Sequence, residues 1–232
     1  MKEHIYSIPL TEALEENCGC PLCSLEKRLQ EQALEYFLGP SMMEPDSREV
    51  TNDKGFCKKH LGMLFDKNNR LSLALMLETH IKDLENGMVV PKKAGMFSKE
   101  TSGDIFSDYL YRKINGCALC DKLNSQMADA AGNFAYMWGA EEDFRKLFEK
   151  SEGLCLEHTA LVAKNCNGEL HGKQKDEFLS LLAGNQKKKL EVIYENIHNF
   201  TLSFDYRNAG KELTADEKES VQTTINYLAK DI

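Results

Sequence analysis

Four short pairs of cysteine and histidine residues could bind metal ions. Each pair has two residues between its members, and in chain order the pairs are Cys20 and Cys23, Cys57 and His60, Cys117 and Cys120, and Cys155 and His158. Two cysteines at this spacing can direct both sulfurs at one ion, about 4 Å from each other, as tetrahedral coordination requires. A cysteine and a histidine three positions apart are neighbours on one helix face and can reach the same ion. Thiolates and imidazoles are the usual ligands of structural zinc.

The last two pairs repeat the first two. Cys117 follows Cys20 after 97 residues, and Cys155 follows Cys57 after 98, so the ligand spacing occurs twice. We interpret this pattern as an internal duplication in which each repeat closes its own zinc site. The expected ligand sets are Cys20, Cys23, Cys57 and His60 in the first repeat, and Cys117, Cys120, Cys155 and His158 in the second. Closing the intervening loop costs roughly 3 kcal/mol, whereas structural zinc contributes on the order of 10–16 kcal/mol.

An iron–sulfur cluster is the main alternative to zinc. The first repeat holds four cysteines that could bind such a cluster, namely Cys18, Cys20, Cys23 and Cys57. The second repeat has Asn115 in the place of Cys18. A thiol redox motif normally stands in a βαβ context, and this sequence shows no strand pattern. We predict zinc in both sites, with iron–sulfur or thiol redox chemistry as the alternative.

The metal pairs favour a structural role over a catalytic one. A site with four protein ligands has no open position for a substrate. No Ser-His-Asp order, phosphate loop or dinucleotide fingerprint is present, so no catalytic residue and no further cofactor is predicted. Cys18 and Cys166 lie outside the pairs and are expected to be ordinary core cysteines. The favoured function is an interaction or regulatory module that holds two zinc ions.

Composition and charge narrow the class of protein. The 232 residues are 42% hydrophobic, which is enough for a packed core, and their net charge of −8 argues against a nucleic-acid-binding face. Residues 1–10 lack a signal-peptide pattern, and the apolar stretch Leu71–Leu77 is too short to span a membrane. We therefore expect a cytoplasmic protein with no membrane or nucleic-acid partner, in which the eight cysteines serve as metal ligands more than as disulfides. A protein partner and the oligomeric state stay open.

Apolar residues at helical spacing predict an all-α protein. Pro21 suits the first turn of a helix that ends before Gly39. A capping box from Thr214 to Glu217 opens the last helix. The other expected helices cover residues 12–16, 57–66, 71–84, 105–114, the stretch from the second cysteine pair to Trp138, 141–149, 156–164 and 173–202.

The duplication divides the chain into four expected segments. They are a first metal-binding repeat at 1–87, a linker at 88–103, a second metal-binding repeat at 104–170, and a C-terminal helical extension packed on the repeats at 171–232. Residues 39–55 contain two prolines and two adjacent methionines, so an irregular loop is expected there. Such a loop could line an enzyme pocket at Met42, Met43 and Glu44, with the metals as scaffold. Alternatively, it is a packed connector whose methionines fill gaps in the core.

Five short motifs are distinctive enough for a comparison with known families. They are Ile8-Pro9-Leu10, Cys20-Pro21-Leu22-Cys23, the run from Tyr36 to Pro45, Gly55-Phe56-Cys57, and Phe204-Asp205-Tyr206-Arg207. With these motifs the whole chain resembles an uncharacterised family of bacterial proteins found mainly in anaerobic Firmicutes. Such families carry a domain-of-unknown-function label, so the resemblance implies no activity. The anaerobic hosts of the family add weight to the iron–sulfur alternative.

Overall fold

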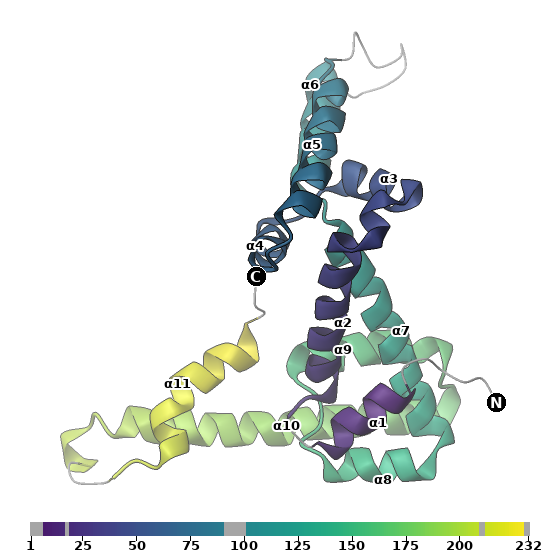
Figure 1. Ribbon diagram of the computed structural model, residues 1–232. Helices are drawn as coiled ribbons and strands as arrows, with labels where there is room; N and C mark the ends of the chain where they lie inside the picture. The colour runs from purple at the N-terminus through teal and green to yellow at the C-terminus, as the bar shows by residue number, and fades with distance from the viewer. Residues whose placement is uncertain (1–6, 17–18, 91–100, 209–211, 230–232) are drawn as a thin grey trace. The chain divides into compact units, whose positions relative to one another are not determined.

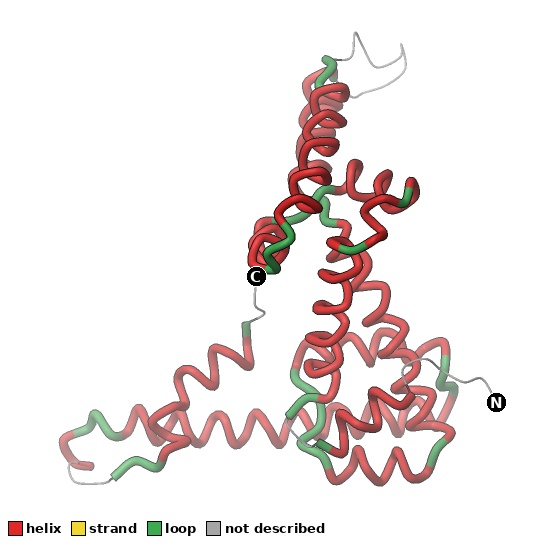
Figure 2. The backbone as a smooth tube through the Cα atoms, in the orientation of Figure 1, coloured by secondary structure: helices red, strands yellow, loops and turns green. Residues whose placement is uncertain are grey.

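The computed structural model describes residues 7–16, 19–90, 101–208 and 212–229. In these residues the chain consists of helices and loops without a strand, so the all-α prediction is confirmed (Figure 2). None of the described helices is both long and apolar enough to cross a bilayer. The α-helices are α1 (Ser7–Glu15), α2 (Pro21–Leu38), α3 (Pro45–Lys54), α4 (Lys58–Asp66), α5 (Arg70–Gly87), α6 (Ser102–Asn115), α7 (Ala118–Ala140), α8 (Glu142–Lys150), α9 (Leu156–Asn165), α10 (Gly172–Leu202) and α11 (Ala215–Leu228).

The chain divides into two compact units. The first contains Met1–Glu26 and Met127–Ile232, and the second contains Lys27–Gln126. The boundaries fall inside α2 and α7, so each of these helices contributes residues to both units. The expected repeats at 1–87 and 104–170 do not coincide with these units, because each repeat is divided between them. The division into the four expected segments stays a prediction.

An aromatic cluster forms the core of the first unit. Phe134 of α7 packs edge-to-face on Phe144 and Phe148 of α8, at ring-centroid distances of 5.1 and 5.0 Å. Trp138, one turn further along α7, lies against Phe178 of α10 at 4.6 Å. All five side chains are at most 4% exposed. Burial of these large apolar rings therefore holds α7, α8 and α10 together (Figure 1).

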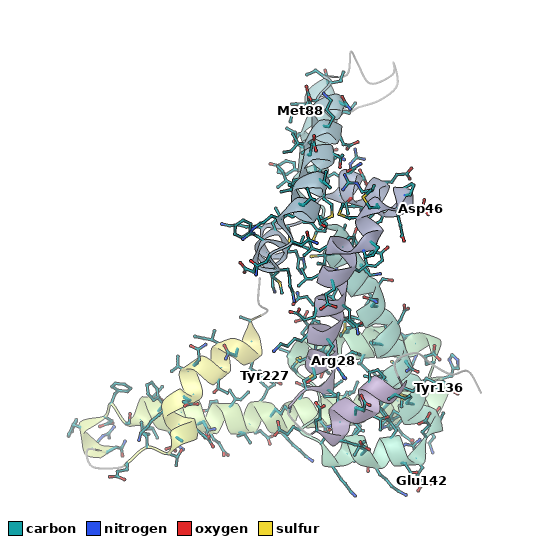
Figure 3. All side chains as sticks on the ribbon, in the orientation of Figure 1. Arg28, Asp46, Met88, Tyr136, Glu142 and Tyr227 are labelled. Atoms are coloured by element: carbon teal, nitrogen blue, oxygen red, sulfur yellow. The ribbon has the colours of Figure 1, made fainter. Side chains whose placement is uncertain are left out.

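Hydrogen bonds connect the C-terminal helices of the first unit to the turn that precedes α9. Thr214 and Glu217 form the predicted capping box at the start of α11. α11 packs on the long α10 (Figure 1). The hydroxyl of Tyr227, labelled in Figure 3, donates to the side-chain oxygen of buried Gln186 on α10. The Gln186 amide in turn donates to the Leu154 carbonyl at 2.9 Å, so hydrogen bonds run from α11 through α10 to that turn.

A buried lysine joins three helices of the second unit. The Lys113 side chain on α6 is 6% exposed, and its ammonium lies 3.0 Å from Asp53 Oδ1 of α3 and 2.9 Å from Asp83 Oδ2 of α5. It also donates to the Asp53 carbonyl at 2.8 Å. An ammonium has three protons, and each of them finds an acceptor here. Figure 1 shows α5 and α6 side by side, with α3 packed on α5.

Residues 39–55 form helices, so the expectation of an irregular loop there is wrong. Pro40 begins a 3₁₀ helix at Pro40–Met43, and Pro45 begins α3. Proline fits both places because the first helical residue has no helical hydrogen bond to donate. Asp46, labelled in Figure 3, lies in the first turn of α3, where the helix dipole favours a negative charge. Met43 is 74% exposed and so does not fill a gap in the core.

The linker expected at residues 88–103 lies mostly outside the described residues, which omit 91–100. Of its remaining residues, 88–90 form a loop. Ser102 already belongs to α6, which opens with a capping box between Thr101 and Asp104.

Candidate metal centres

All eight predicted ligands lie at the beginnings of four helices. The first member of each pair stands just before its helix, and the second is the third helical residue. The cysteines in the leading position are Cys20 before α2, Cys57 before α4, Cys117 before α7 and Cys155 before α9. Backbone N–H groups at a helix start have no helical acceptor, and the dipole is positive there. Each ligand pair therefore lies where a thiolate is stabilised.

The structure groups the pairs differently from the sequence prediction. Centre 1 consists of Cys20, Cys23, Cys155 and His158, and centre 2 of Cys57, His60, Cys117 and Cys120. Each centre thus takes its Cys-x-x-Cys pair from one repeat and its Cys-x-x-His pair from the other. The expectation that each repeat closes its own site is wrong, although all eight predicted ligands belong to one or the other group. Centre 1 lies wholly within the first compact unit, and centre 2 within the second.

Centre 1 has the dimensions of a site for a single ion. Nδ1 of His158 lies 3.5 Å from the Cys20 sulfur and 3.3 Å from each of the other two sulfurs. The sulfurs of Cys23 and Cys155 are 3.7 Å apart. Around a tetrahedral zinc ion, with ordinary bond lengths, sulfurs are separated by about 3.8 Å and sulfur and nitrogen by about 3.6 Å. The four ligand atoms therefore fit one zinc ion.

Centre 2 repeats this arrangement. Nδ1 of His60 lies 3.3 Å from the sulfurs of Cys57, Cys117 and Cys120. The Cys57 and Cys120 sulfurs are 3.9 Å apart. The backbone N–H of Cys120 points at the Cys117 sulfur, at 3.4 Å. The donor set, three thiols and one imidazole, is that of a structural zinc site.

The described thiols among those proposed for one iron–sulfur cluster belong to two different groups of ligand candidates. Cys57 belongs to centre 2, whereas Cys20 and Cys23 belong to centre 1. Cys18 lies outside the described residues. A cluster of two or four irons also spreads its ligand sulfurs over several irons, and the ligand atoms of each centre, which all lie within 4.8 Å of one another, leave no room for it.

The second nitrogen of each ligand histidine meets a different residue of α2. Nε2 of His158 lies 3.4 Å from a carboxylate oxygen of Glu26, and Nε2 of His60 lies 3.0 Å from the side-chain amide of Gln30. A group that accepts the Nε2 proton fixes the tautomer and leaves Nδ1 free for a metal. The Gln30 oxygen can do so when the amide is turned by 180°. Centre 1 thus has a carboxylate beside its histidine that centre 2 lacks.

Neither Glu26 nor Gln30 was singled out from the sequence. Glu26 is three residues after Cys23, so both lie on one face of α2. This spacing is the one sign in the sequence that Glu26 lies near a metal site. It becomes useful only once the structure shows that His158 lies opposite Glu26.

Protons in centre 1 are shared among its sulfurs and its histidine. Hydrogen bonds from Cys20 and Cys23 lower the pKa of the Cys155 thiol, and hydrogen bonds to Cys155 and Cys20 raise the pKa of Cys23. Burial alone would lower the pKa of His158, but hydrogen bonds to the sulfurs and to Glu26 raise it to about 12. A metal ion would displace these protons, since it binds thiolates and neutral imidazole.

In centre 2 the histidine is held neutral. Burial lowers the pKa of His60, and the charge of Lys59 lowers it further. Burial and the neighbouring Cys117 raise the pKa of Cys120 to about 12. The imidazole is therefore in its metal-binding form, and the thiols would lose their protons to the ion.

A glycine shapes the turn before centre 2. Gly55 has φ of 57°, and a side chain there would come within 2.6 Å of the His80 ring. His80 places Nδ1 2.8 Å from the Asn52 carbonyl and so packs this turn instead of forming a further metal site. The Gly55 carbonyl accepts a hydrogen bond from Ala118 at 2.9 Å, which holds the start of α7 beside the turn that leads to Cys57.

The remaining candidates lie away from both centres. Cys166 is fully buried and donates to the Ala163 carbonyl at 3.2 Å, as expected of a core cysteine. A surface hollow does occur in the second unit, but it is lined by Gly87, Val89, Ile105, Tyr109 and Arg112, among others. Residues 42–44 do not line it. A pocket at those residues stays a prediction.

One protein family accounts for the entire chain. The model of that family matches residues 1–232. The chain belongs to the family of unknown function DUF6062. No curated protein and no solved structure matches it. Membership of the DUF6062 family confirms the resemblance to a family without assigned function.

Proposed function

We propose that this DUF6062 protein is a cytoplasmic double zinc-binding protein in which both zinc ions are structural and the helical scaffold acts as an interaction or regulatory module. The observation that carries the proposal is the pair of Cys₃His sets, each with ligand atoms within 4.8 Å of one another. Each ion would join the starts of two helices from different repeats. Four protein ligands leave no position for a substrate, which supports a structural role.

A reducing compartment suits the use of the cysteines as metal ligands. Among the described residues seven cysteines are free, and six of them belong to the two centres. Cysteines that are neighbours in space stay unpaired in the cytosol and are oxidised in secreted proteins. The net charge of −8 supports the absence of a nucleic-acid partner.

An interaction role is supported by exposed aromatic residues near the end of α10. Tyr194 is 64% exposed, Phe204 77% and Tyr206 86%. A photo-reactive amino acid at position 206 should cross-link to a partner protein in cells, whereas the same group at exposed Lys173 should not. Equal labelling at both positions would contradict the interaction role.

Metal content and an absorption spectrum test the zinc assignment. The protein should be purified without oxygen and without added metal. We expect about two zinc ions per chain and no visible absorption. Iron with a charge-transfer band would instead support the iron–sulfur or redox alternative, although four ligand atoms within 4.8 Å of one another favour a single ion. The enzyme alternative would require turnover that depends on residues 42–44.

A further inference from the structure

We propose that centre 1 is a redox-sensitive site that releases its zinc when a hydroperoxide oxidises Cys23, whereas centre 2 keeps its metal. The inference rests on the proposed zinc binding and adds a regulatory role to one of the two sites. The geometry points to it because the centres have the same ligands and similar distances but differ in the exposure of their cysteines.

The difference in exposure lies in the Cys-x-x-Cys pairs. In centre 1 Cys23 is exposed and Cys20 is half-buried. In centre 2 Cys117 is buried and Cys120 is half-buried. The ligand histidines do not differ, since His60 and His158 are 3% and 2% exposed. Oxidation of cysteine follows thiolate character and solvent access, so a dissolved oxidant reaches centre 1 first.

The two centres also differ in the charged residues beside their ligands. Lys58 and Lys59 stand between Cys57 and His60, whereas Leu156 and Glu157 occupy the same positions in centre 1. With zinc bound, the cysteines of both centres are deprotonated, and positive neighbours then make a thiolate less nucleophilic. Centre 1 has no such lysines between its Cys155 and His158, and it has the Glu26 carboxylate at its histidine.

A second sulfur is in place to complete the oxidation. The Cys23 thiolate attacks a peroxide oxygen, so that an S–O bond forms, the O–O bond breaks, and the released oxygen leaves as water after taking up a proton. The Cys155 sulfur, 3.7 Å away, then attacks the sulfenic acid, and the oxygen leaves as a second water. Two thiolates lose two electrons to one hydrogen peroxide. The two ligands that remain cannot hold zinc in a four-ligand site.

Zinc release by hydrogen peroxide tests this directly. Zinc-loaded full-length protein is mixed with hydrogen peroxide and a chromophoric chelator that reports free zinc. One of the two zinc ions should be released about tenfold faster than the other, or more. Differential alkylation and peptide mass spectrometry should find a disulfide between Cys23 and Cys155, with the cysteines of centre 2 still reduced. A dithiol reductant should restore zinc binding.

Variants that lack one centre show which zinc ion is released in the fast phase and which in the slow phase. Cys120→Ser should abolish centre 2 and leave the fast phase, and Cys155→Ser should leave the slow phase. Cys166→Ser, which changes a buried cysteine outside both centres, should alter neither phase. Release of both ions at one rate, or oxidation of centre 2 first, would overturn the inference and leave the zinc assignment intact. Protein that holds no zinc before peroxide is added would instead contradict the proposed function.

Discussion

The sulfurs of Cys23 and Cys155 lie 3.7 Å apart, although 132 residues separate them in the chain. This contact shows how the duplicated pattern is used. The first Cys-x-x-Cys pair meets the last Cys-x-x-His pair, and the two middle pairs meet each other inside that long loop. The two centres are therefore nested along the sequence, and each joins the first repeat to the second.

Removal of metal should destabilise the protein. Each centre brings three thiols and an imidazole together at two helix starts, and without an ion these groups have only weak hydrogen bonds to one another. Chelation under reducing, anaerobic conditions should lower the melting temperature and speed amide exchange in the first turns of α2, α4, α7 and α9. Adding zinc back should reverse both changes. An unchanged melting temperature after verified zinc removal would show that the centres are not structural.

Glu26→Gln should weaken centre 1 alone. The substitution removes the negative charge 3.4 Å from Nε2 of His158 but keeps an acceptor of the kind that Gln30 offers in centre 2, so the affinity of centre 1 for zinc should fall by about 10-fold or less. Competition with a chelator should show weaker binding of one zinc ion and unchanged binding of the other. Glu31→Gln is a matched control on the same helix, because Glu31 pairs with Lys67 and not with a ligand. Equal loss from both variants would exclude the assigned role of Glu26.

Lys113→Met should destabilise the second unit by roughly 1–2 kcal/mol. The lost hydrogen bonds are charge-assisted, but Asp53 and Asp83 are about half exposed and become solvated once the lysine is gone. Denaturant unfolding of zinc-loaded protein measures the change. Lys82→Met, which removes an exposed pair with Glu85, should change stability by less than about 0.5 kcal/mol.

The contribution of Lys113 should depend on pH. Burial alone would lower its pKa, but Asp83 and Asp53 raise it above 10.5, so its stabilisation is complete below pH 10.5 and is lost as pH rises through the folded pKa. The hydrogen bond from Lys113 lowers the pKa of Asp53 below 3.8. The contribution of Asp53 to stability is therefore present above pH 3.8 and is lost as pH falls through the lowered pKa. The stability difference between wild type and Lys113→Met should therefore be constant from pH 7 to 9 and shrink above pH 10.5. A difference that grows in alkali would contradict the ion pair.

Local structure was largely predictable from the sequence, because its signals are local. Pro21 begins α2 as expected, and Thr214 and Glu217 cap α11 as expected. The exceptions are residues 39–55, where the prolines predict a loop, and α1, which begins at Ser7 and not at residue 12. Pro40 and Pro45 each begin a helix, a position that suits proline as well as a loop does.

The ligand pairing could not be predicted from spacing. Closing a loop of 132 residues instead of one about a quarter as long costs only about 1.2 kcal/mol more, which is small beside the contribution of zinc. Both pairings also give the same Cys₃His donor set. The observed pairing agrees with tertiary contacts such as the hydrogen bond from Ala118 to the Gly55 carbonyl, which joins the helix starts that carry Cys57 and Cys117. These contacts join residues that no sequence motif connects.

The zinc content of two double variants tests the nested centres most directly. Cys20→Ser with Cys155→Ser removes two ligands of centre 1, whereas Cys20→Ser with Cys57→Ser removes one ligand from each centre. The first variant should retain about one zinc ion per chain and the second almost none, because a structural site needs all four ligands. Both should be measured beside Cys166→Ser, which should retain about two. If the first variant loses both ions and the second keeps one, each repeat closes its own site and the nested arrangement is wrong.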